Sequence, residues 1–257
     1  MPMLQAHSLL WHYLWVAPNV ILLVLAILIW RRNLQQQYPV FLFYAVVSAL
    51  VQLTVYAADV IPWVSATAWW YVFWTSLLVE SLIKFALIGE LFGRIFGMYP
   101  ALAKVARLFI RGVGVVLVLV AAVAAAYTPK DSNFRIVSGA HLLEQTIYLI
   151  VCGLILFLFR FAAYFKLNWN RSSWGVALGL GISACIHLAT WALAANGNFP
   201  ERYRIDLDFT NMITYHLCVL LWFYYLLAPQ KSVTTSTVPP PDHSLEVWNR
   251  ELERLIH

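Results

Sequence analysis

The sequence predicts an all-α integral membrane protein built as a bundle of seven transmembrane helices. Of its 257 residues, 62% are hydrophobic and only 11% are charged, whereas soluble domains contain about 45–50% apolar and about 25% charged residues. The hydrophobic residues gather into seven stretches, each long enough to cross a hydrocarbon core of about 30 Å. The basic residues are distributed unevenly between the loops, which predicts an orientation in the membrane.

Proline-containing or polar turns separate the seven predicted spans. The first ten residues contain no Lys or Arg, so we expect the first hydrophobic stretch to cross the membrane rather than to be a cleavable signal peptide. The seven predicted spans are Leu14–Trp30, Val40–Ile61, Trp69–Phe92, Ala106–Tyr127, Ala140–Phe165, Trp174–Ala195 and Phe209–Leu227.

The loops after the first, third and fifth spans are rich in basic residues. With the adjoining helix ends they hold Arg31, Arg32, Arg94, Lys104, Arg107, Arg111, Arg160, Lys166 and Arg171. The loops on the other side hold only Lys130, Arg135, Arg202 and Arg204. Since basic loops remain in the cytoplasm, we expect the N-terminus outside, the C-terminus in the cytoplasm, and a multi-pass location in the cell (plasma or inner) membrane.

The chain divides into a seven-helix domain (1–228), a linker rich in Pro, Thr and Ser (229–243) and a short amphipathic tail helix (244–257). One apolar face of the tail combines Leu245, Trp248, Leu252 and Leu255. The opposite face is slightly acidic, whereas helices that lie on membranes are usually basic. We therefore expect the tail to contact a cytoplasmic protein partner, although a frayed terminus without function is the alternative.

The third span carries Glu80 and Lys84 in its hydrophobic interior. About 11 residues at about 1.5 Å each place Glu80 about 17 Å from the start of the span, near the middle of the bilayer. A single charge there costs on the order of 3 kcal/mol or more. We therefore expect this helix to face the interior of the bundle and Glu80 to pair with Lys84, one turn away. Glu90 and Arg94 have the same spacing and predict a second pair near the cytoplasmic end.

Further polar residues recur on single faces of other predicted spans, at three- and four-residue spacing. If these faces turn toward a shared centre, their depth places most of them in the outer half of the bilayer. The sequence thus predicts a polar cavity or hydrogen-bonded core there. The candidate ligand-binding residues are Gln52, Tyr56, Glu80, Lys84, His141, Glu144, Tyr148, His187, Tyr215 and His216.

Several interpretations of this polar interior remain open. His141, Glu144, His187 and His216 include residue types that bind metal or haem, but no compact ligand motif joins them. Intramembrane carboxylates and histidines also form proton relays. The stripes also fit helix packing alone. The cofactor therefore stays undefined, and the cysteines 152, 185 and 218 fit small core residues better than a disulfide framework.

Motifs of the known seven-helix families that we considered are absent. The last predicted span contains no lysine for a retinal Schiff base and no His-x-x-x-His pair, since His216 stands alone there. Our leading hypothesis is a receptor or sensor that binds a small ligand in the outer-half cavity and signals through a cytoplasmic partner. The alternatives are a non-catalytic subunit of a larger membrane complex and an intramembrane metal or haem protein or enzyme. The hydrophobicity of the chain gives no reason to expect a nucleic-acid partner.

Overall fold

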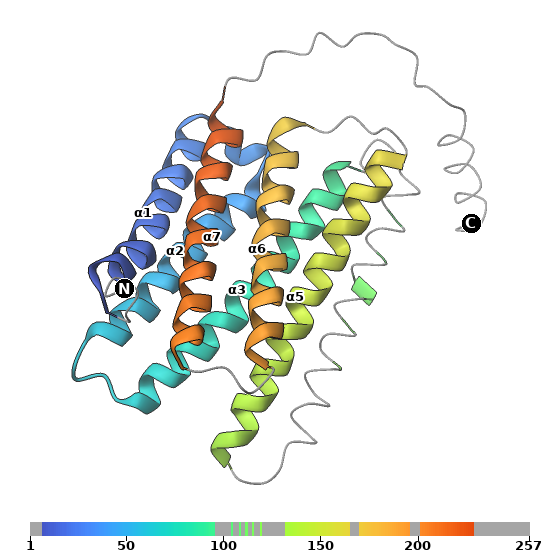
Figure 1. The fold of residues 1–257 in the computed structure, drawn as a ribbon. Helices are drawn as coiled ribbons and strands as arrows, with labels where there is room; N and C mark the ends of the chain where they lie inside the picture. Colours follow the sequence, from blue (N-terminus) through green and yellow to red (C-terminus); the bar gives the residue numbers. More distant parts are fainter. Residues whose placement is uncertain are drawn as a thin grey trace, which may run out of the picture.

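The computed structural model describes residues 7–95, 132–164, 170–195 and 201–228, together with six separate positions between 104 and 119. The side chains of residues 132–144, 195, 201 and 202 lie outside this description. Every regular element within the described residues is a helix, and six of these helices are long and apolar enough to cross a membrane (Figure 1). An all-α, multi-pass membrane architecture is therefore supported at this level.

The helices follow one another along the bundle with short connections. Their bounds are α1 Leu9–Arg31, the short 3₁₀-helix η1 Leu34–Gln36, α2 Pro39–Val60, α3 Ala66–Ile95, α5 Ser132–Tyr164, α6 Arg171–Ala195 and α7 Glu201–Leu227. The fourth predicted span, Ala106–Tyr127, falls mainly on residues outside the description, as do the linker and the tail helix.

Several helices begin earlier than the hydrophobic stretches that predicted them, because polar residues start them. The Oγ of Ser8 accepts the N–H of Trp11 at 3.3 Å, which satisfies a donor in the first turn of α1. The Oγ of Ser65 accepts the N–H of Ala68 at 3.1 Å at the start of α3. Pro39 opens α2, where its missing N–H is of no consequence.

The two helices with the largest differences are α5 and α7. The structure begins α5 at Ser132 and α7 at Glu201, whereas the hydrophobic pattern predicted Ala140 and Phe209. Their first turns are polar and continue the helix beyond the apolar segment. Both helices therefore extend beyond the apolar spans that the sequence predicted.

The helices form a closed ring in the order α1, α2, α3, α5, α6, α7, with α7 packed back against α1 (Figure 1). The helices α1, α3, α5 and α7 begin at the end of the bundle where α2 and α6 finish. We call this the His7 end and the opposite one the Arg94 end. The helices α3 and α5 therefore run in the same direction.

Aromatic side chains fill the ring toward the Arg94 end. The indole of Trp222 on α7 lies edge-on to the rings of Phe41 and Tyr44 on α2, at centroid distances of 5.7 and 5.8 Å. All three side chains are fully buried. The indole N–H of Trp222 donates to the carbonyl of Val176 at 3.3 Å. This half of the ring is therefore closed by tightly packed, largely apolar side chains.

The cysteines follow the expectation only in part. Cys152 and Cys218 are buried, but Cys185 is exposed and so is not a core residue. The three are free thiols, and the sulfurs of Cys152 and Cys185 lie 3.6 Å apart between α5 and α6. These sulfurs therefore mark a place where the two helices are in close contact.

Candidate functional site

The candidate site begins where α3 enters the bundle. No residue of Ala66–Val79 is buried, and Glu80 is the first buried residue of this helix, with 6% of its surface exposed. From Glu80 toward the Arg94 end, α3 packs into the apolar core. The carboxylate of Glu80 therefore lies at the boundary between a loosely packed half and a closed half of the bundle.

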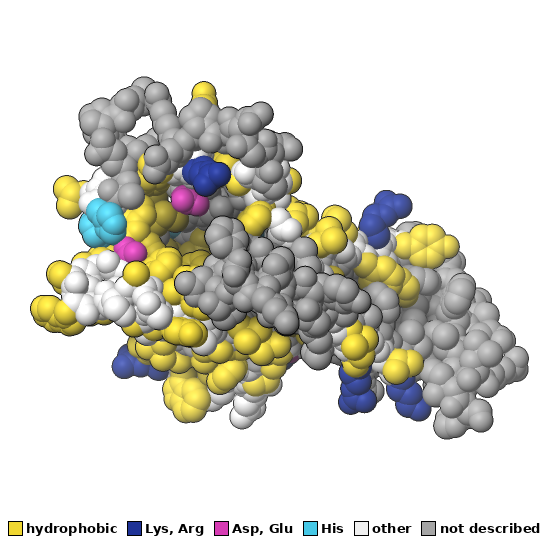
Figure 2. Space-filling view, turned by 90° about the horizontal axis from the view of Figure 1, so that it is seen from below, with side chains coloured by type: hydrophobic (Ala, Val, Ile, Leu, Met, Phe, Trp, Pro, Cys, Tyr) yellow, Lys and Arg dark blue, Asp and Glu magenta, His cyan; other side chains and the backbone are white. Residues whose placement is uncertain are grey.

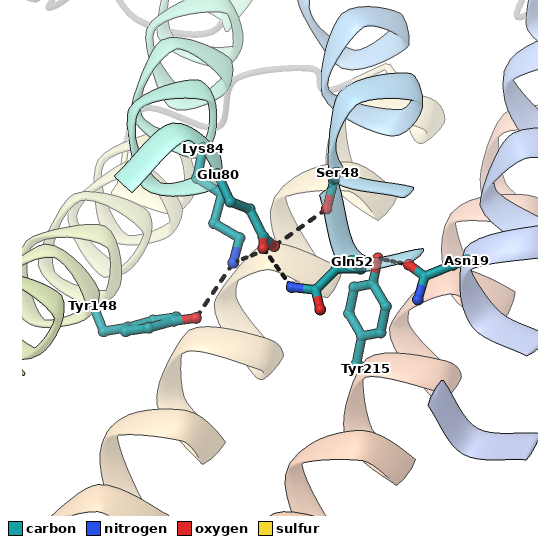
Figure 3. A network of polar contacts seen from close by, with 7 residues as sticks. All are labelled: Asn19, Ser48, Gln52, Glu80, Lys84, Tyr148 and Tyr215. Carbon is teal, nitrogen blue, oxygen red and sulfur yellow. Dashed lines mark hydrogen bonds and ion pairs between the residues drawn. The ribbon is translucent and has the colours of Figure 1, made fainter. Parts of the chain in front are cut away.

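Three side chains donate hydrogen bonds to the Glu80 carboxylate (Figure 3). The Nζ of Lys84 lies 2.9 Å from Oε1, in the expected i, i+4 pair. Ser48 on α2 donates to the same oxygen at 3.2 Å, and Gln52, one turn further, donates from Nε2 to Oε2 at 2.7 Å. The predicted Glu80–Lys84 pair is thus confirmed, and both carboxylate oxygens are occupied.

Lys84 extends this group of side chains to α5 and α6. Its Nζ donates to the hydroxyl of Tyr148 at 3.3 Å and lies 5.2 Å from the centre of that ring. The imidazole of His187 stacks on the Tyr148 ring with 3.9 Å between centroids. We call Ser48, Gln52, Glu80, Lys84 and Tyr148 the Glu80 network, with His187 packed against it. The network therefore joins α2, α3 and α5 and contacts α6.

A second polar contact joins α7 to α1 beside this network (Figure 3). The hydroxyl of Tyr215 donates to Oδ1 of Asn19 at 3.3 Å, and Nδ2 of Asn19 donates to the carbonyl of Trp15 at 2.6 Å. Tyr215 also lies within electrostatic range of Glu80. Asn19 was not among the predicted site residues, although a single asparagine inside an apolar stretch is a signal for a buried polar contact.

The predicted residue Tyr56 lies elsewhere, in an aromatic cluster at the His7 end. Its hydroxyl is 3.0 Å from Nδ1 of His12, and its ring contacts Trp11 and Trp15. The ring of His7, at the start of the described chain, lies 4.6 Å from that of Trp11. The structure therefore separates Tyr56 from Gln52, although both belong to one predicted stripe on α2.

The remaining predicted site residues are not part of the Glu80 network as described. His216 contacts the ring of Tyr13 on α1 at 5.7 Å, and its buried Nδ1 has no hydrogen-bond partner. The side chains of His141 and Glu144 lie outside the described residues.

Asp208, at the start of α7, lies within electrostatic range of His187. Within the described residues, no three His, Cys, Asp or Glu side chains form a group that could hold a metal ion.

The surface at the His7 end is hollowed. Figure 2 shows a depression there with hydrophobic walls, beside acidic and histidine side chains. In the same half of the bundle, Gln52, Tyr148, His187 and Tyr215 are half-buried rather than fully buried. Side chains around Glu80 therefore retain some accessible surface.

A separate ionic contact closes the Arg94 end. Glu90 accepts from Arg94 at 3.0 Å, which confirms the predicted i, i+4 pair. Its other oxygen accepts the N–H of Phe41 in the first turn of α2 at 3.1 Å, so Glu90 caps that helix from α3. The guanidinium of Arg94 also lies 4.3 Å from the centre of the Tyr38 ring. This contact is structural and distant from the Glu80 network.

No protein-family model matches the chain, and comparisons with curated proteins and with solved structures find no significant match.

Proposed function

We propose that this chain is a membrane receptor or sensor that binds a small ligand next to the Glu80 network. The observation that carries the proposal is the position of this network. It joins three helices, contacts a fourth through His187 and borders the hollowed half of the bundle. A ligand that contacts Gln52 and Tyr148 together would change the position of α5 relative to α2 and α3.

The proposed orientation places the His7 end outside and the Arg94 end in the cytoplasm. Exposed basic side chains at the Arg94 end of the described helices are Arg31, Arg32, Arg160 and Arg171. At the His7 end, Arg204 accompanies three acidic residues, Asp59, Asp206 and Asp208. This distribution supports cytoplasmic retention of the Arg94 end.

Signalling would proceed through the cytoplasmic tail. The helix α7 ends at the Arg94 end, where the guanidinium of Arg32 donates to the carbonyl of Leu227 at 2.9 Å. The linker and tail follow from that point. Deletion of Ser244–His257 should release a cytoplasmic partner held by Leu245, Trp248, Leu252 and Leu255. An unchanged set of co-purified proteins would contradict a role for the tail.

The test of ligand binding is native mass spectrometry of the chain extracted in mild detergents, with a visible absorption spectrum of the same sample. We expect a stoichiometric small-molecule adduct that is lost in Gln52→Met. The control is Thr54→Val, an exposed substitution on the same helix. A bare mass in every mild detergent would contradict a resident ligand, and a metal or chromophore would favour the metal or haem alternative.

The second candidate is a non-catalytic subunit of a larger membrane complex. The observation in its favour is that donors from this chain already occupy both oxygens of Glu80, as in a contact that only fixes helix packing. A stoichiometric second polypeptide in the same mass spectrum would support this candidate. A monodisperse single chain would count against it.

A further inference from the structure

The Glu80 network has unused hydrogen-bonding capacity on two of its members. The ammonium group of Lys84 has three N–H donors, and the described contacts use two of them, toward Glu80 and Tyr148. Only 13% of the Lys84 side chain is exposed. A buried ammonium N–H without an acceptor is unfavourable, so an acceptor supplied from outside would bind there.

The second unused group is the amide oxygen of Gln52. Because Glu80 is a carboxylate that accepts, the nitrogen of the Gln52 amide must face it, at 2.7 Å. The oxygen Oε1 therefore points away from Glu80 (Figure 3). No described side chain donates to this oxygen, and it is not among the fully buried, unpartnered atoms of the described residues. It is an accessible acceptor on the half-buried Gln52 side chain.

These two groups lie on opposite oxygens of the same carboxylate. Lys84 binds Oε1 of Glu80, and Gln52 binds Oε2. A ligand that spans them needs an acceptor for the Lys84 N–H and, close beside it, a donor for Oε1 of Gln52. Primary amides and lactams present a carbonyl oxygen and an N–H on one edge in this way.

The charge of the site further restricts the ligand. Glu80 and Lys84 already neutralise each other at 2.9 Å. A carboxylate or ammonium ligand would add an unpaired charge inside the hydrocarbon region, which is strongly unfavourable. A neutral polar group adds none. The hydrophobic walls of the depression at the His7 end (Figure 2) suit an apolar body attached to that group.

We propose that the ligand of this site is a neutral molecule with an apolar body and a primary amide or lactam edge. Its carbonyl oxygen accepts from Lys84, and its N–H donates to Oε1 of Gln52. This inference rests on the proposed function, because it defines the chemistry of the ligand that the receptor would bind.

The test uses octanamide and methyl octanoate as probes, which share an apolar chain and a carbonyl but differ in the N–H donor. The full chain in lipid nanodiscs is titrated with each probe, tryptophan fluorescence is followed, and affinity is expressed per mole fraction of probe in the lipid. We expect octanamide to bind about tenfold more tightly, because the ester leaves Oε1 of Gln52 unpaired.

Two variants make the test specific. Gln52→Met removes the acceptor and should abolish the preference for the amide. Thr54→Val is an exposed substitution on the same helix that leaves the free groups of Lys84 and Gln52 intact, so it should keep the preference. Thermal unfolding of each variant confirms that it is folded.

Equal binding of the two probes, a preference that survives in Gln52→Met, or binding of neither probe would overturn the amide inference. The receptor proposal is judged separately by native mass spectrometry. A co-purified adduct that lacks an amide or lactam edge would leave the receptor proposal standing and reject this one. A bare mass would count against the receptor proposal itself.

Discussion

Glu80 accepts hydrogen bonds from Ser48 and Lys84 on one oxygen and from Gln52 on the other. In a hydrocarbon environment, a charge with this many partners is stabilised only as long as all of them remain in place. Removal of one member therefore leaves unpaired the groups that it bound. The energetic effect of a substitution depends on which groups it leaves unpaired.

We predict the result of a double-mutant cycle on Glu80 and Lys84. Glu80→Ala leaves the ammonium of Lys84 without its counter-charge and should lower the free energy of unfolding by about 3–5 kcal/mol. The further substitution Lys84→Met should recover most of this loss. A residual loss of about 1–3 kcal/mol should remain, because Gln52 and Ser48 lose their acceptor. Reversible unfolding in mixed detergent and SDS micelles measures each value.

The matched control is Thr54→Val, an exposed substitution on α2. It should change the free energy of unfolding by no more than about 0.5 kcal/mol. If the double variant is as unstable as Glu80→Ala alone, Lys84 is not the principal partner of Glu80.

Helical spacing was sufficient to predict the pairs Glu80–Lys84 and Glu90–Arg94, because both partners lie on one helix. Contacts between helices were less predictable. Gln52 and Tyr56 share a face of α2, but one turn of helix places them against different neighbours. Asn19 belongs to no stripe, so its contact with Tyr215 required the packing of α1 against α7.

Helices α6 and α7 pack most closely where glycine faces an aromatic ring. A Cβ added at Gly179 would overlap the indole of Trp222, and one at Gly175 would overlap the ring of Tyr225. The indole of Trp222 is itself held by the core and by its bond to Val176. Small residues at such positions let helices approach each other within membranes.

We therefore predict that Gly179→Ala lowers the free energy of unfolding by about 1–3 kcal/mol, because Trp222 must move. The control is Gly153→Ala on α5, where an added Cβ meets no atom within 4 Å. That variant should be neutral or slightly stabilising, since alanine favours helix more than glycine does. Equal effects of the two substitutions on unfolding in mixed micelles would contradict the close contact at Gly179.

The contact of α5 with α6 allows a covalent test. The sulfurs of Cys152 and Cys185 are 3.6 Å apart, so a thiol oxidant should join them within one chain in the Cys218→Ser background. Mass spectrometry should find the loss of two hydrogen atoms and an intramolecular Cys152–Cys185 peptide. Cross-links found only between separate chains would show that this helix pair is wrongly placed.

Hydrophobic length alone was enough to predict the existence of the helices, because each stretch must satisfy its backbone inside the membrane. It could not predict where they begin. The helix starts near Ser8 and Ser65 depend on side-chain hydrogen bonds to the first turn, and polar turns lengthen α5 and α7. These features lie outside the apolar segments from which the spans were predicted.

At the level of the whole molecule, the ring order of the helices was not predictable. No spacing in the sequence states that α7 packs against α1 or that α3 lies next to α5. The number of spans was predicted as seven, and six are described. The fourth predicted span falls mainly outside the described residues, so the prediction of seven spans stays a prediction.

Labelling of single cysteines tests the orientation. In a cysteine-free background, Trp63→Cys lies in the exposed turn after α2, at the His7 end, and Gln36→Cys lies in η1, at the Arg94 end. An impermeant maleimide applied to intact cells should label the first position only. After the cells are opened, both should react. Labelling of Gln36→Cys alone in intact cells would reverse the proposed orientation.

The two acidic residues of α3 have a mechanical consequence. Glu80 binds α2 at Ser48 and Gln52, and Glu90 binds the backbone of the same helix at Phe41. The two attachments are ten residues apart, or about 15 Å along the helix. Two attachments this far apart prevent α3 from sliding along α2 or rotating against it. The pair α2–α3 would then act as the fixed frame of the bundle, and any movement would fall on α5, α6 and α7.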